Sequence, residues 1–163
     1  MEGIMLCEKI LGHISDPKFA GKKIDYVEIE WHEAFKKLHK KETRDGEAIG
    51  IRMDHHILTR GLKDGDVLYA DEEKVVVVEI PACEVIIIQV DEHHPKMREK
   101  VCYEIGNKHA TLFWGEEEGT FITPYNEPTL VMLQKIHGVT AWRDVIKLNF
   151  ENSISSSINN HHH

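Results

Sequence analysis

The chain contains 12 histidines among its 163 residues, and one of them stands where the backbone would fix its position. His109 follows the pair Gly106-Asn107, which is typical of a helix end, and precedes the apolar segment Leu112–Trp114. Neutral imidazole is a suitable ligand for Ni²⁺, Cu²⁺ and Zn²⁺. We therefore treat His109 as a candidate metal ligand, with a purely structural histidine as the alternative.

One imidazole is too few to hold such an ion tightly, but a two-fold axis between identical chains would bring two together. The apolar segment Leu112–Trp114 could supply the interface. The chain also ends in His161-His162-His163, which could reach His109 on a flexible tether and raise the local imidazole concentration. The alternative is that these three residues are the remainder of a purification tag. We interpret the adjacent pairs His55-His56 and His93-His94 as exposed surface, because neighbouring strand residues point to opposite faces.

The elements before Pro81 are predicted to be mainly strands. The segment Ile24–Trp31 alternates, with Asp25, Val27 and Ile29 on one side. Asp45-Gly46 is typical of a hairpin turn, and it would join arms at about 37–43 and 48–53. Four lysines near the first arm could form a docking surface or simply protect an edge strand, and they are Lys36, Lys37, Lys40 and Lys41.

After Pro81 the pattern changes to strand, helix, strand, strand, helix, strand. Cys83–Val90 is an apolar strand, a helix with its apolar face toward a core follows Pro95, and a second helix should begin near Pro128 and end at Gly138. This order is the ferredoxin-like βαββαβ motif. We predict an α+β protein with a β-rich domain at 1–80, a ferredoxin-like domain at 81–150 and a flexible tail at 151–163.

Several blocks of the chain resemble one known family. Gly106-Asn107-Lys108-His109 resembles the Gly-Asn-Arg-His signature of the urease accessory nickel metallochaperones, the UreE type, with Lys108 in place of arginine. The likeness runs from about Met5 to about Leu148 and is greatest to the helicobacter-like branch. Further blocks match in the same order: Ile24–Trp31, Lys40–Gly46, Gly65–Tyr69 and Thr123–Leu130.

The resemblance implies a cytoplasmic, homodimeric metallochaperone that delivers Ni²⁺ for urease assembly. It implies that the His109 side chains of two subunits bind nickel at the dimer centre, with His161, His162 and His163 as further ligands. Zn²⁺ or Cu²⁺ would compete, because Cu²⁺ binds such ligands more tightly than Ni²⁺. The implied partners are the urease accessory GTPase and the apo-urease complex. The chain has no GxxxxGK[ST] motif, so it is not that GTPase.

The composition and the absence of certain motifs argue against several other classes of protein. A net charge of -8 argues against a nucleic-acid-binding protein, whose affinity depends on basic contacts with phosphate. No apolar run is long enough to span a membrane, and the three cysteines form no CxxC pair, which fits a reducing cytoplasm. No HExxH motif is present, and no HxH motif occurs before the terminal His161-His162-His163, so we predict that the protein is not an enzyme. The remaining alternative is a protein-binding module whose metal binding is incidental.

Overall fold

The computed structural model describes residues 3–155 of the chain. It contains two compact units, Met1–Pro81 and Ala82–His163. Among residues 3–155, no helix combines the length and the apolar composition needed to cross a membrane.

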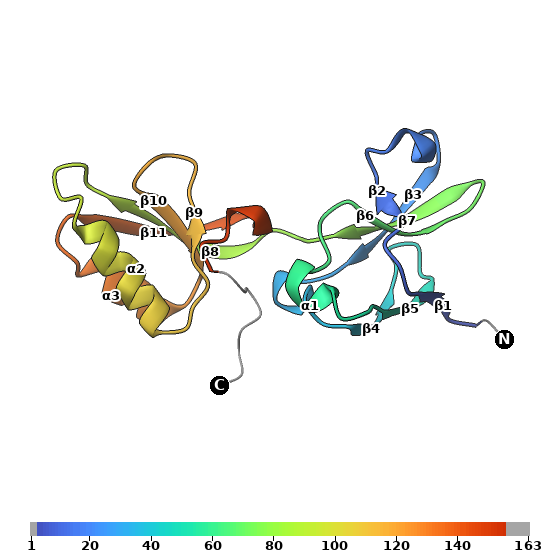
Figure 1. The fold of residues 1–163 in the computed structure, drawn as a ribbon, viewed down its shortest axis with the longest axis horizontal. Helices are drawn as coiled ribbons and strands as arrows, with labels where there is room; N and C mark the ends of the chain where they lie inside the picture. The colour runs from blue at the N-terminus through green and yellow to red at the C-terminus, as the bar shows by residue number, and fades with distance from the viewer. Residues whose placement is uncertain (1–2, 156–163) are drawn as a thin grey trace. The chain divides into compact units, whose positions relative to one another are not determined.

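The amino-terminal unit is built from two sheets (Figure 1). The first has the order β1-β5-β4 and the second the order β2-β6-β7-β3. The strands are β1 (Met5–Cys7), β2 (Gly12–His13), β3 (Lys23–Glu28), β4 (Leu38–Glu42), β5 (Ala48–Arg52), β6 (Asp66–Ala70) and β7 (Lys74–Glu79). The short helical segments are η1 (Pro17–Phe19), η2 (Trp31–Glu33) and α1 (Ile57–Arg60).

Strand β7 lies between β6 and β3, and this position explains its composition. Its four consecutive valines, residues 75–78, are all buried, as expected for a strand covered on both faces. On the neighbouring strand β3, Asp25 and Val27 are buried while Ile24 is exposed, so the predicted alternation is confirmed. The hairpin turn at Asp45-Gly46 is also confirmed, and Gly46 has the positive φ of 93° that such a turn requires.

The carboxy-terminal unit has the predicted ferredoxin-like fold. Its elements are β8 (Cys83–Val90), α2 (Met97–Asn107), β9 (Phe113–Trp114), β10 (Thr120–Pro124), α3 (Glu127–Gln134), β11 (Val139–Ile146) and η3 (Phe150–Asn152). The strands form one antiparallel sheet in the order β11-β8-β10-β9. Both helices lie on one face of this sheet (Figure 1). The predicted α+β class is therefore confirmed.

The core of this unit lies between the helices and the sheet. Val101 and Ile105 of α2 and Leu133 of α3 pack with Ile86 and Ile88 of β8. Helix α3 begins at a well-formed cap, where the Asn126 side chain accepts a hydrogen bond from the backbone N–H of Thr129.

Two boundaries differ from the prediction. Helix α3 ends at Gln134 rather than at Gly138, so His137 lies in the following turn. The first residues of the predicted flexible tail are ordered, because the Ile154 N–H donates to the Leu112 carbonyl (2.8 Å) and the Ile154 side chain packs against the core. The rest of the tail, 156–163, lies outside the described residues.

Candidate metal centre

His109 occupies a special backbone position at the end of α2. It has a φ of 59°, and it is the one residue other than glycine with a positive φ in the described part of the chain. Its N–H donates to the Gly106 carbonyl (3.0 Å), and the Ala110 N–H donates to the Ile105 carbonyl (3.2 Å). These two bonds form a Schellman motif, with His109 in the left-handed position that glycine usually takes.

The predicted helix end at Gly106-Asn107 is confirmed, because helix α2 ends at Asn107. The left-handed residue that follows the helix is His109, not a glycine. Ala110 packs against the core cluster that contains Ile105, which is the apolar contact that accompanies this motif. The position of the His109 backbone is thus set by the core, although its side chain is exposed. A left-handed residue other than glycine costs about 1–2 kcal/mol, and such cost is often found at functional sites.

Only part of the predicted interface segment after His109 is exposed and could contact a second chain. Leu112 and Phe113 are buried in their own unit, with exposed fractions of 5% and 1%. An apolar strand can be buried in its own core or against a partner, and the sequence alone does not separate these two cases. Trp114 is 56% exposed, and Tyr103 on α2 is 69% exposed. Two large apolar side chains on the elements flanking His109 are therefore open to solvent.

Other possible ligands near His109 are limited. His161, His162 and His163 lie outside the described residues. Within residues 3–155, no group of three or more His, Cys, Asp or Glu side chains is arranged to hold a metal ion. The thiols are poor candidates, because burial and then the Glu47 charge raise the pKa of Cys7 to about 11. Burial also raises the pKa of Cys102, and the thiolate is the form that binds metal.

The lysine-rich arm in the amino-terminal unit lies on β4, which is an edge strand as expected for lysines that protect a sheet edge. Lys41 is engaged within the unit, because its Nζ atom lies 3.0 Å from Glu33 Oε1. This ion pair lowers the pKa of the Glu33 carboxyl. Lys36 and Lys40 are exposed. Any basic docking surface here would therefore depend mainly on Lys36 and Lys40.

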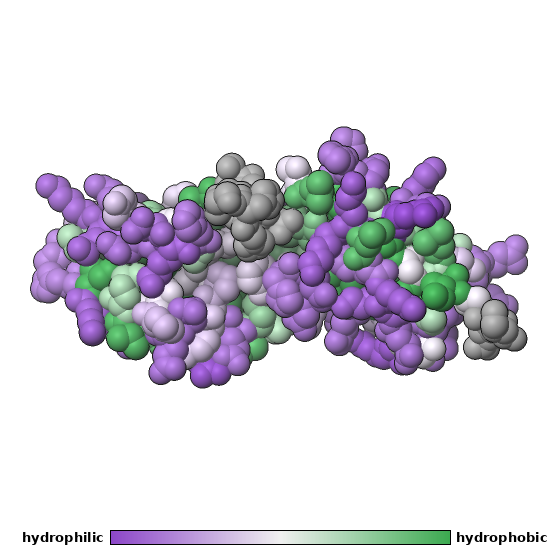
Figure 2. Space-filling model, turned by 90° about the horizontal axis from the view of Figure 1, so that it is seen from below, coloured by the Kyte–Doolittle hydropathy of each residue, from purple (hydrophilic) through white to green (hydrophobic). Residues whose placement is uncertain are grey.

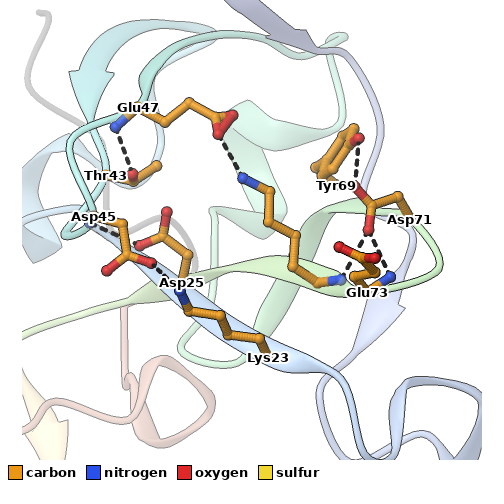
Figure 3. Close-up of polar contacts among 9 residues, drawn as sticks. Lys23, Asp25, Thr43, Asp45, Glu47, Tyr69, Asp71 and Glu73 are labelled. Carbon is orange, nitrogen blue, oxygen red and sulfur yellow. Dashed lines mark hydrogen bonds and ion pairs between the residues drawn. The ribbon is translucent and has the colours of Figure 1, made fainter.

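The turn after β4 is held by its own unit (Figure 3). The Asp45 N–H donates to Asp25 Oδ1 (3.0 Å), and the Glu47 N–H donates to Thr43 Oγ1 (3.0 Å). Lys74 on β7 donates to the Glu47 carboxylate across the turn. Asp45 also pairs with Lys23, and Arg44 pairs with Glu28 and Glu79. The charged side chains of the turn are therefore engaged within the unit, and the hairpin is not a free basic arm.

Comparison with known proteins identifies the family. Residues 7–81 match the model of the UreE urease accessory protein, N-terminal domain. The urease accessory protein UreE of Helicobacter acinonychis (strain Sheeba) is 39% identical over 132 residues, which cover 81% of this chain and 76% of that protein. The protein of the same name from Acetivibrio thermocellus is 37% identical over 144 residues, which cover 88% of this chain and 89% of that protein.

The chain belongs to the UreE family of urease accessory proteins. The resemblance seen in the sequence is therefore confirmed, and relatives from Helicobacter pylori, such as strain 26695 at 38% identity, agree with the expected branch. The match to the UreE N-terminal domain falls on the β-rich unit, whereas His109 lies in the second unit.

Sequence reasoning missed one histidine contact in this UreE-family chain. The rings of His94 and His137 lie 4.6 Å apart, centroid to centroid, with an angle of 70° between their planes. The sequence pattern indicates that His94 is exposed surface, and it places His137 within the helix predicted to end at Gly138, with no sign that the two meet. In the sequence, Gly138 is the one residue that indicates a turn next to His137. In the structure it has a positive φ of 78°, which forms that turn.

Proposed function

We propose that this chain is a nickel-binding metallochaperone that delivers Ni²⁺ for assembly of the urease active site. The observation that carries the proposal is an exposed histidine held in a left-handed backbone position at a helix end, in a chain that belongs to the UreE family. The protein would act in the cytoplasm as a carrier, with no chemical step of its own. Zn²⁺ and Cu²⁺ would compete for the same imidazoles.

In this proposal the ferredoxin-like domain, 81–150, binds metal and forms the homodimer. Tyr103 and Trp114 flank His109 and are more than half exposed, so they could bury apolar area against a second copy. A two-fold axis near His109 would then bring two imidazoles to one ion. His161, His162 and His163 would complete the ligand set. The β-rich domain, 1–80, would bind partner proteins.

A carrier site must release its ion as well as bind it. A closed shell of four protein ligands suits a structural metal, whereas a site with few fixed ligands exchanges its ion more readily. Two His109 imidazoles on anchored backbones, with ligands from the chain end, would meet this requirement. Ligand type alone does not select nickel, so selectivity would come from geometry and from the partner that accepts the ion.

The test is a calorimetric titration with Ni²⁺ of the chain in which His161, His162 and His163 are replaced by alanine. We expect a binding event with a stoichiometry of about one Ni²⁺ per two chains, and we expect His109→Ala in this background to lose that event, whatever other Ni²⁺ sites the chain holds. His93→Ala is the matched control, because His93 is also an exposed histidine of the same unit, and it should leave binding unchanged. Equal binding by the His109→Ala variant would remove His109 from the site.

The dimer can be tested separately by sedimentation equilibrium. Trp114→Ser should shift the chain toward monomer, because it removes an exposed indole next to the proposed interface. Trp142→Ser is the control, since Trp142 is 41% exposed on β11 and is not part of the proposed interface. If Trp114→Ser leaves the mass unchanged, the dimer forms through another surface.

Hand-over to the urease accessory GTPase is the second half of the proposal. The expected result is that Ni²⁺ moves from the loaded chain to the purified GTPase faster than it moves to a small chelator of equal affinity. Equal rates would mean that the ion is simply released to solvent.

The competing function is a protein-binding module with incidental metal binding. Its supporting observation is the exposed Lys40 on edge strand β4. Lys40→Ala is the clean variant, because Lys41→Ala would also break the ion pair with Glu33. Loss of binding to the urease accessory complex with unchanged Ni²⁺ binding would favour this function for the β-rich unit.

A further inference from the structure

A second pair of histidines lies in the carboxy-terminal unit, away from the end of α2. His94 precedes α2 and His137 follows α3, so the fold brings together two turns that are far apart in the sequence. Their rings are in edge-to-face contact at 4.6 Å between centroids. His94 is partly buried and His137 is exposed. Solvent therefore reaches the pair from the side of His137.

The two turns are fixed to each other by the backbone. The Asp91 N–H donates to the Gly138 carbonyl (2.8 Å), and the His94 N–H donates to the Asp91 carbonyl (2.9 Å). Gly138 packs directly on His94, since a Cβ atom built on this glycine would lie 2.9 Å from His94 Cβ. The backbones that carry the rings are thus held in place, and only side-chain rotation remains free.

The separation of the rings suits a shared ion. An imidazole nitrogen binds Zn²⁺ at about 2.0–2.1 Å, so two nitrogens on one such ion lie within about 4.2 Å of each other. Rings whose centroids are 4.6 Å apart meet this limit after rotation about χ2, a torsion that is broad for histidine. Two imidazoles with water at the other positions form a ligand set for Ni²⁺, Cu²⁺ or Zn²⁺.

An acidic depression lies beside the turn that carries His137. Its volume is about 570 Å³, and it is lined by Gly138, which packs on His94, and by four carboxylates: Asp91, Glu92, Glu117 and Glu118. Arg98 pairs with Glu118 at 3.2 Å and offsets one of these charges. The positive end of α2 also begins nearby, at Met97. The remaining carboxylates outnumber these positive groups at the depression, so an approaching divalent ion meets a negative field.

We propose that His94 and His137 form a second, open metal site that takes a late first-row divalent ion such as Ni²⁺ from solution. The site has two protein ligands and an acidic approach, so it exchanges its ion quickly. It does not depend on His109 or on a second copy of the chain. The contrasting role is a purely structural contact between two aromatic rings.

The probe is Ni²⁺ alone, titrated into the full-length chain with His109, His161, His162 and His163 replaced by alanine. Calorimetry should detect one binding event per chain. His94→Ala and His137→Ala should each abolish this event, and the double variant should lose nothing further, because both residues serve one ion. Paramagnetic broadening by Ni²⁺ should affect the imidazole NMR signals of His94 and His137 before those of the other histidines.

Two controls separate a ligand from a structural ring. His137→Phe keeps an aromatic ring against His94 and removes the metal-binding nitrogens, so it should fold normally and lose the event. His93→Ala removes the adjacent histidine, whose side chain is 81% exposed, and should keep the event. Retained binding in His137→Phe, or independent losses in the two alanine variants, would overturn the proposal. Failure of the His109 site in its own titration would leave this result unaffected.

Discussion

Replacing His109 by glycine separates what this residue does for metal binding from what it costs the fold. His109 has a φ of 59° and takes the position that glycine usually takes in a Schellman motif. The left-handed conformation costs a residue with a Cβ about 1–2 kcal/mol. Glycine avoids this cost but loses about 0.4–1 kcal/mol through the greater freedom of the unfolded chain. We therefore expect His109→Gly to stabilise the carboxy-terminal unit by about 0.5–1 kcal/mol.

The assay is thermal unfolding in the presence of a chelator, which removes any contribution from bound metal. For a domain of this size the gain corresponds to a rise in Tm of about 2–8 °C. His109→Ala is the control, because alanine lacks the imidazole but keeps the Cβ, and comparison with glycine cancels whatever contacts the imidazole makes. Both variants should lose the proposed nickel site. If His109→Ala is as stable as His109→Gly, the left-handed position costs no more than glycine loses through the freedom of the unfolded chain, and the predicted gain is refuted.

The remaining predictions concern other residues. Gly106→Ala should raise the unfolding free energy by about 0.5–1 kcal/mol in a thermal scan, because Gly106 lies within α2 and nothing is within 4 Å of a Cβ built there. Gly138→Ala should instead lower it, because its φ is 78° and a Cβ would meet His94 at 2.9 Å. Burial lowers the pKa of His39, so below about pH 6.5 the unfolded chain takes up a proton that the folded chain resists. Stability should therefore fall with falling pH by at most about 1.4 kcal/mol per unit from this residue, and His39→Gln should remove that part of the slope in urea titrations. Cys7, with its pKa raised to about 11, should be alkylated slowly at pH 8 in the folded chain and rapidly in denaturant, as mass spectrometry of the labelled peptides would show.

The elements of both units follow from local patterns in the sequence. The valines of β7, the alternation on β3 and the apolar face of α2 each match an element that buries those residues. Pairing between distant strands is not encoded in the local sequence pattern. No local pattern predicts that β1 pairs in parallel with β5. The same limit explains the contact between His94 and His137, which depends on how two turns meet after folding.

His109 as a metal ligand stays a prediction, but the structure shows why its backbone is special. The sequence pattern placed the helix end at Gly106-Asn107, where α2 does end, and the packing of Ala110 with Ile105 leaves His109 in the left-handed conformation. Leu112 and Phe113 looked like an interface and proved to be core. In both cases the local pattern gave the type of element, and packing decided which residue filled each position.

The position of His109 bears on how a carrier could combine capture with release. In a left-handed residue at a helix end the direction of the Cα–Cβ bond is set by the backbone, and here the backbone is anchored to the core through Ala110 and Ile105. The origin of the ligand is thus fixed while its side-chain torsions are free, so the imidazole searches only a small volume for the ion. In the proposed dimer only this ligand from each subunit would have an anchored backbone, so the shell around the ion would stay open to an incoming partner ligand. Nickel transfer should then proceed by replacement of the mobile ligands first, and its rate should rise with the concentration of the acceptor.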